Sequence, residues 1–143
     1  MHDKIKIRRA VMKDIPELIV IVKGVSSIED YPNEYNKNYF VKMLKRNIVL
    51  SAEIDDKIVG FAEFEWDKHA KRVFLESVAV AKKFRGKGIA SRLLEEAESF
   101  AKRKRANLIS MLVRDWNTAM NSLAKKKKYV KSDNFYLWGK RLP

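Results

Sequence analysis

The chain has 143 residues, 46% of them hydrophobic and 10% aromatic, which predicts one folded globular domain over residues 1–143. Lysine and arginine number 31 against 18 acidic residues, and the resulting charge of +13 predicts an anionic cofactor, ligand or partner. Because the chain has no cysteine and only two histidines, disulfides, cysteine-ligated zinc and cysteine nucleophiles are excluded and no metal site is expected.

The sequence contains no candidate membrane segment. A membrane-spanning helix needs roughly 18 or more consecutive apolar residues, and no stretch reaches that length. Residues 1–6 also lack the apolar run of a signal peptide. We therefore expect a cytoplasmic protein that does not insert into a membrane.

In the N-terminal part, strand and helix patterns alternate. The patterns predict a strand over Ile5–Arg8, a helix that begins near Asp14, a helix over about Glu34–Arg46, and strands over Ile48–Ile54, Lys57–Trp66 and Arg72–Val80. Asp14 is expected to cap the first helix, with Glu17 at the capping-box position. The turn at Asp55–Asp56 predicts a hairpin between the second and third strands.

The C-terminal part continues the alternation. It predicts a long helix from Ile89 to about Arg105, a strand over Leu108–Val113, a helix over about Asn117–Lys127 and a final strand over Asn134–Leu142. The order β-α-α-β-β-β-α-β-α-β predicts an α/β or α+β layered domain, in which Arg72–Val113 forms a parallel crossover. Trp116 and Trp138 are expected in the core, with an acceptor pocket as the alternative.

The most informative segment is the turn Arg85-Gly86-Lys87-Gly88-Ile89-Ala90, between an apolar strand end and a helix start. Glycine lets the backbone approach a ligand closely, and the free N–H groups of a first helical turn attract anions. Arg85 and Lys87 add positive charge, so the segment predicts a phosphate-binding turn. The dinucleotide fingerprint is excluded because Ser91 occupies its third glycine position. The alternative is a turn that only reverses the chain.

These residues resemble a known family. Arg85-x-x-Gly88-x-Ala90, after Val78-Ala79-Val80, is similar to the [RQ]xxGx[GA] acetyl-CoA motif of the GCN5-related N-acetyltransferase (GNAT) superfamily. Similar segments occur in order along the chain at 7–10, 14–18, 57–62 and 138–142. The resemblance implies the GNAT fold, a mixed and mainly antiparallel sheet with helices on both faces. It also implies acetyl transfer from acetyl-CoA to a primary amine on a protein N-terminus, a lysine or a small molecule.

The resemblance further implies roles for individual residues. The cofactor-binding positions would be Val78, Ala79 and Val80 along the pantetheine arm, Arg85, Gly86, Lys87, Gly88, Ile89, Ala90 and Ser91 around the pyrophosphate, and Asn117 after the next strand. The Val78 N–H is the candidate donor to the thioester oxygen. Glu76, two residues earlier on the same strand, is the first candidate for the base that deprotonates the amine, ahead of Glu63 and Glu65.

Two positions depart from the family pattern. Leu112 and Ala124 stand where a catalytic glutamate and tyrosine often occur in this superfamily. A GNAT-fold module that binds acetyl-CoA without turnover is therefore an alternative. A nucleic-acid-binding protein is a second one, suggested by the +13 charge and Lys125–Lys128. It is not favoured, because a lysine run at a helix end is usually solvated. The choice between monomer and homodimer stays open.

Overall fold

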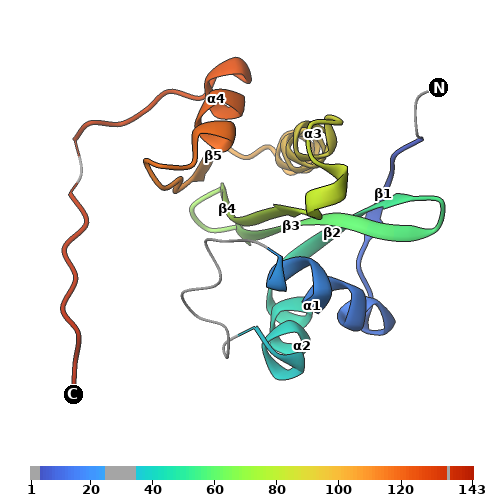
Figure 1. Cartoon of the computed structure of the whole chain (residues 1–143). Coiled ribbons are helices and arrows are strands. Elements are labelled where there is room, and N and C mark those ends of the chain that lie inside the picture. Colours follow the sequence, from blue (N-terminus) through green and yellow to red (C-terminus); the bar gives the residue numbers. More distant parts are fainter. Residues whose placement is uncertain (1–3, 25–34, 135) are drawn as a thin grey trace. The chain divides into compact units, whose positions relative to one another are not determined.

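Five strands form one sheet in the order of the chain (Figure 1). They are β1 (Lys6–Arg9), β2 (Ile48–Ile54), β3 (Lys57–Asp67), β4 (Arg72–Val80) and β5 (Leu108–Met111). The first four pair antiparallel, and β5 joins β4 in parallel, which confirms the mixed sheet and the parallel crossover. This computed structural model describes residues 4–24, 35–134 and 136–143, in two compact units, 1–112 and 113–143.

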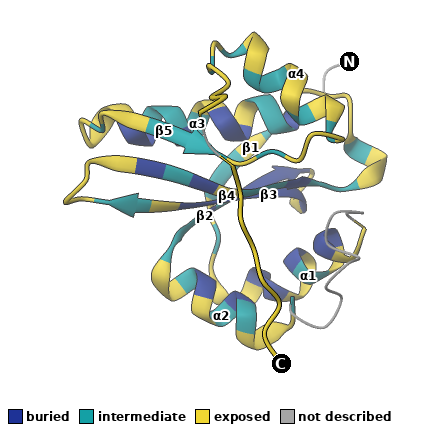
Figure 2. Cartoon of the chain, turned by 90° about the vertical axis from the view of Figure 1, so that its left-hand side faces the viewer, coloured by how far each residue is buried: buried dark blue, intermediate teal, exposed yellow. Residues whose placement is uncertain are grey.

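Helices cover both faces of the sheet, as expected (Figure 2). On one face lie α1 (Ile15–Lys23) and α2 (Lys37–Arg46), whose apolar residues pack with those of β2, β3 and β4. On the other lies α3 (Ile89–Arg103), where the Phe100 ring meets Phe64 of β3 edge to face at 5.1 Å between centroids. The sheet is thus buried between two helical layers, and its ends and edges are the places left for a site.

The β2–β3 hairpin turns at Asp55 and Asp56, as the sequence predicted. Both residues have positive φ angles, 51° and 62°, and Ile54 pairs with Lys57. This is the geometry of a two-residue type I′ turn, for which aspartate is one of the tolerated residues.

The start of α1 differs from the expectation, because Asp14 makes no side-chain cap of that helix. Its carboxylate instead accepts two hydrogen bonds from the Arg8 guanidinium, at 2.8 and 2.9 Å, and one from the Val11 N–H at 2.7 Å. Arg8 also pairs with Glu53. Glu17 makes no capping box either, since its carboxylate accepts the Ile58 N–H at 2.9 Å. Both carboxylates therefore connect α1 to the sheet.

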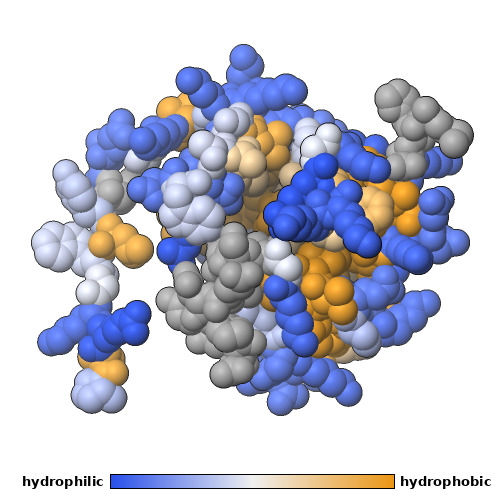
Figure 3. Space-filling model, viewed as in Figure 1, coloured by the Kyte–Doolittle hydropathy of each residue, from blue (hydrophilic) through white to orange (hydrophobic). Residues whose placement is uncertain are grey.

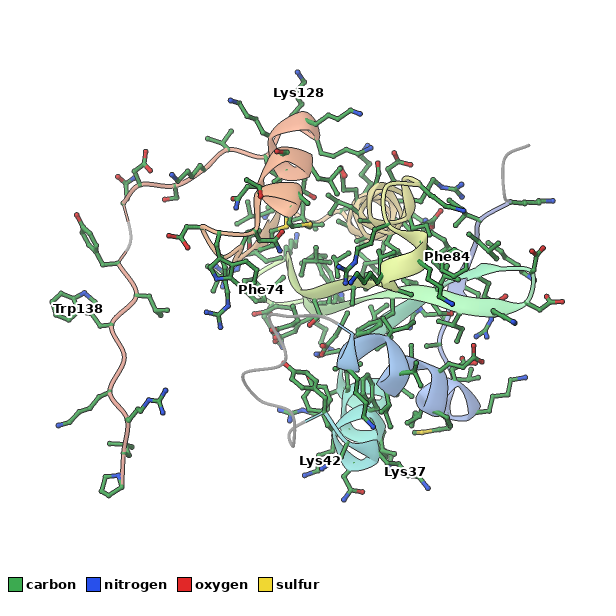
Figure 4. All side chains as sticks on the ribbon, viewed as in Figure 1. Lys37, Lys42, Phe74, Phe84, Lys128 and Trp138 are labelled. Atoms are coloured by element: carbon green, nitrogen blue, oxygen red, sulfur yellow. The ribbon has the colours of Figure 1, made fainter. Side chains whose placement is uncertain are left out.

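The second unit contains α4 (Thr118–Lys126) and a C-terminal segment without regular secondary structure in residues 127–134 and 136–143. The predicted final strand over Asn134–Leu142 is therefore wrong for the described residues. So is the expectation that Trp116 and Trp138 belong to the core, because they are 53% and 90% exposed. Figure 4 labels Trp138 on the C-terminal segment. An alternating pattern makes a strand only where a partner supplies the hydrogen-bonded ladder, and no such pairing is found for this segment.

The surface is mostly hydrophilic. In the view of Figure 3, hydrophilic residues surround smaller apolar areas, one of them over α1, where Val20 is 70% exposed. No helix in the described part of the chain combines the length and the apolar character needed to cross a membrane.

Candidate active site

The C-terminal half of β4 has one open edge. β5 pairs only with Arg72–Leu75, so the strand continues to Val80 without a partner on that side among the described residues. The Ala81 N–H donates to the Val59 carbonyl at 2.8 Å, on the β3 side. Because successive residues of a strand direct their backbone groups to opposite edges, those of Val78 and Val80 face the open edge. The open edge thus lies at the residues that the family resemblance assigns to the pantetheine arm.

The glycine turn follows directly after this edge. Gly86 and Gly88 have φ angles of +79° and +81°, a region that side chains rarely adopt, and a Cβ on either would meet no atom within 4 Å. Gly88 is the N-cap of the 15-residue α3, and the first intrahelical bond runs from Arg92 N to the Gly88 carbonyl. The N–H groups of residues 89–91 therefore have no acceptor within the helix. The positive end of the α3 dipole, the N–H groups that lack an acceptor within the helix, and the open space at the two glycines together suit a pyrophosphate group.

The charge of Arg85 suggested a phosphate-binding role, but its side chain donates hydrogen bonds to two backbone carbonyls of the protein. Its Nε donates to the Val80 carbonyl at 3.0 Å, and its Nη2 donates to the Gly24 carbonyl at the end of α1 at 3.3 Å. The side chain thus ties the turn to β4 and α1. Lys87 lies with its Nζ 5.4 Å from the centre of the Phe84 ring, which Figure 4 labels beside the turn. The candidate anion-binding groups of the turn are therefore chiefly backbone N–H groups.

A β-bulge places Glu76. Glu63 pairs with Ser77 and Phe64 with Leu75, so Glu76 is the extra residue of β4 between these pairs. A bulge re-aims the side chain that it carries. Here it brings Glu76 to the face covered by α2, where it lines a pocket, while Val78, two residues further on, faces the open edge.

The pocket has a volume of about 460 Å³ and lies between α2, β3 and β4. It is lined by Tyr39, Lys42, Met43, Arg46, Asn47, Glu63, Glu65, Trp66 and Glu76. Glu63 is only 4% exposed. Its Oε2 accepts a hydrogen bond from Asn47 Nδ2 at 2.7 Å, and the Tyr39 hydroxyl lies 3.5 Å from its Oε1. The pocket therefore has a buried carboxylate, with Glu65 and Glu76 as exposed ones.

Burial alters the acid–base chemistry of this pocket. Burial raises the pKa of Glu63 above its ordinary value, and the nearby charge of Glu76 adds to this, against the hydrogen bond from Asn47. Partial burial also raises the pKa of Glu76, with a further contribution from the charge of Glu65. A carboxylate with a raised pKa is a better proton acceptor near neutral pH than an ordinary one.

The predicted site residues fall into two groups. Glu76, Val78–Val80 and the turn 85–91 follow one another along β4 and into α3. Asn117 belongs to the second unit, where it caps α4 by accepting the Met120 N–H at 3.1 Å. The sequence argument did not identify Tyr39, Asn47 and Trp66 as pocket residues. The available signal was Glu63 itself, a charged residue within the otherwise apolar run 58–64.

Comparison with known proteins agrees with this geometry. Residues 17–129 match the Acetyltransferase (GNAT) family. The chain is 34% identical over 107 residues to an uncharacterised N-acetyltransferase of Archaeoglobus fulgidus, which covers 67% of this chain and 73% of that protein. The PaiA N-acetyltransferase of Thermoplasma acidophilum, solved with coenzyme A, superposes with a TM-score of 0.78 at 22% identity, covering 87% of this chain and 88% of that one. An aminoglycoside N-acetyltransferase solved with CoA gives 0.77 at 16% identity, covering 99% and 98%.

The fold is that of acyltransferases that use a CoA thioester. The chain belongs to the acetyltransferase (GNAT) family and is an acetyl-CoA-dependent N-acetyltransferase. This confirms the fold, the enzyme class and the cofactor expected from the sequence.

Proposed function

We propose that this enzyme transfers the acetyl group of acetyl-CoA directly to a primary amine bound in the pocket between α2, β3 and β4. The amine belongs to a protein N-terminus, a lysine or a small molecule. One observation carries the proposal. The β4 bulge aims Glu76 into the pocket, and the open edge at Val78 begins two residues later and leads to the glycine turn. Acceptor and donor sites therefore meet along one strand.

Backbone groups supply most of the proposed cofactor site. Val78, Ala79 and Val80 bind the pantetheine arm, and the N–H groups of residues 86–91 bind the pyrophosphate. On the open edge, the Val78 N–H and carbonyl are the first groups available, because the Val80 carbonyl already accepts Arg85 Nε. Asn117 is a further candidate cofactor contact, carried over from the family motif.

The chemistry needs a neutral amine, since a protonated one has no lone pair. Acetyl-CoA supplies an activated acetyl group as a thioester. Glu76 accepts a proton from the ammonium group, aided by its raised pKa. The Val78 N–H donates to the carbonyl oxygen on which charge develops. The C–N bond forms as the C–S bond breaks, the nitrogen loses its second proton to water, and solvent protonates the thiolate.

Calorimetric titration of acetyl-CoA tests the cofactor site. We expect Gly88→Asn to abolish measurable binding while the protein stays folded. Asparagine tolerates a positive φ better than other side chains do, and its side chain would occupy the space that Gly88 leaves open. Gly139→Asn is the matched control, because a Cβ there also meets no atom within 4 Å but lies far along the chain from the turn. Unchanged affinity in folded Gly88→Asn would exclude the turn as the phosphate site.

Thiol release with a panel of amines tests the proposed base. We expect Glu76→Gln to lower kcat by about 100- to 10,000-fold, the usual contribution of a general base, with little change in acetyl-CoA affinity. A kcat within about threefold of the wild type would show that Glu76 is not the base. This would direct attention to Glu63, Glu65 or a water chain.

A further inference from the structure

Glu63 is a buried charged residue that the mechanism above does not use. It lies on the central strand β3, only 4% exposed, at the floor of the acceptor pocket. Its two oxygens are approached by neutral groups, the Asn47 amide and the Tyr39 hydroxyl. Within residues 4–24, 35–134 and 136–143, no lysine or arginine forms an ion pair with it. A buried carboxylate without a cation opposes folding, so its presence calls for a reason.

We propose that Glu63 is the acceptor-positioning residue, and that the ammonium group of the amine is the cation this carboxylate lacks. This proposal rests on the proposed function. Asn47 and Tyr39 hold the carboxylate in place from the α2 side. The cavity of about 460 Å³ provides the space for the amine.

The two glutamates then have separate tasks. Glu76, at the exposed side of the pocket, takes one proton from the ammonium group. The neutral amine keeps two N–H bonds, and one of them donates to Glu63. This hydrogen bond fixes the orientation of the nitrogen and leaves its lone pair free to attack. Glu63 thus recognises the acceptor, whereas Glu76 performs the proton transfer.

The burial of Glu63 should also affect how the stability of the enzyme depends on pH. Asn47, Tyr39 and Glu76 act on Glu63 directly, and the other titratable groups that line the same pocket are Lys42, Arg46 and Glu65. Because burial raises the pKa of Glu63, its contribution to folding is most favourable below the ordinary pKa and weakens as the pH rises through the raised value. Removing the charge should therefore stabilise the protein more at pH 8 than at pH 5.

The test compares Glu63→Gln, Glu63→Asp and the wild type, with Glu65→Gln as the matched control for the melting temperature alone. Glu65 is an exposed carboxylate two positions away on the same strand. Melting temperatures are measured at pH 5 and pH 8, acetyl-CoA affinity by calorimetry, and acceptor KM by thiol release. The probe amines are 1,4-diaminobutane, 2-phenylethylamine, leucine amide and a peptide with a free N-terminus.

We expect Glu63→Gln to melt at or above the wild-type temperature at pH 8, and to gain less at pH 5. Its acceptor KM should rise about 10- to 100-fold, as for the loss of a charged hydrogen bond, with acetyl-CoA affinity unchanged. Glu63→Asp should recover part of the KM. Glu65→Gln should leave the melting temperature nearly unchanged.

Either of two results would overturn the role of Glu63 while leaving the proposed function intact. One is an unchanged acceptor KM in Glu63→Gln, and the other is a melting temperature of Glu63→Gln several degrees below that of the wild type at pH 8. If the wild type binds acetyl-CoA but acetylates none of the probes, the proposed function fails and this assignment fails with it.

Discussion

Gly60 is the glycine whose replacement should disturb both the core and the cofactor turn. It lies on β3 opposite Val80. A Cβ at this position would sit 2.9 Å from the Ala79 carbonyl oxygen and 3.2 Å from Cγ2 of Ile89. The first of these atoms belongs to the β4 backbone and the second to the first residue of α3, so neither can move aside like the end of a flexible side chain. Gly60→Ala must therefore separate β3 from β4 or push the start of α3 away from the sheet.

The expected size follows from these contacts. Overpacking of this kind destabilises by about 1–3 kcal/mol, and the lower entropy of unfolded alanine offsets roughly 0.5 kcal/mol. For a chain of this length the net loss corresponds to a fall in melting temperature of roughly 2–8 °C. Acetyl-CoA affinity should fall several-fold, because the Ile89 N–H belongs to the proposed pyrophosphate site and would move with the start of α3.

Thermal unfolding and calorimetric titration measure the two effects on the same samples. Gly24→Ala is the matched control, since its nearest contact would be the Ile21 carbonyl oxygen at an ordinary 3.5 Å. We expect that control to melt within a degree or two of the wild type. If Gly60→Ala behaves like Gly24→Ala in both assays, the close packing of β3, β4 and α3 described above is refuted.

Two further predictions concern the fold. Arg8→Met should lower the melting temperature at pH 7 by roughly 6–12 °C, since it leaves Asp14 and Glu53 buried without their cation, at about 3 kcal/mol. The Arg8 hydrogen bonds lower the pKa of Asp14 below its ordinary 3.8. This stabilisation is therefore present above that pH and is lost as the pH falls through the lowered value. A difference in melting temperature between wild type and Arg8→Met that stays constant from pH 7 to pH 3 would contradict the ion-pair explanation. Trp138→Ala should change stability by less than about 0.5 kcal/mol, because the side chain is 90% exposed, and a loss of several degrees in a thermal scan would restore the core role first expected for it.

The cofactor turn was predictable from the sequence because its parts are contiguous. Strand end, glycines and helix start follow one another within residues 78–91, and the required geometry, positive φ at Gly86 and Gly88, is a property of the local backbone. The hairpin at Asp55–Asp56 was predictable for the same reason. Short-range conformational preferences decide such features before any tertiary contact forms.

The acceptor pocket and the C-terminal segment depend on partners that lie elsewhere in the chain. The surroundings of Glu63 combine Tyr39 and Asn47 from the α2 region with Glu76 from β4, and their meeting depends on sheet register and on a bulge. Likewise, the alternation in residues 134–142 predicts what one face of a strand would look like but not whether a neighbouring strand exists. Asp14 was misassigned because Arg8 of the preceding strand β1 binds its carboxylate in place of the helix cap.

This difference also explains how the chain combines a complete cofactor motif with changed residues at Leu112 and Ala124. The proposed cofactor site is built from backbone N–H and carbonyl groups, so it tolerates many side chains but requires glycine at its two left-handed positions. A proton acceptor is different, because it needs only a carboxylate of raised pKa at the meeting point of donor and acceptor. On the sheet face covered by α2, both β3 and β4 offer such a position, occupied here by Glu63 and Glu76. The base proposed above at Glu76 is therefore compatible with the same fold, whereas the turn is fixed by its backbone geometry.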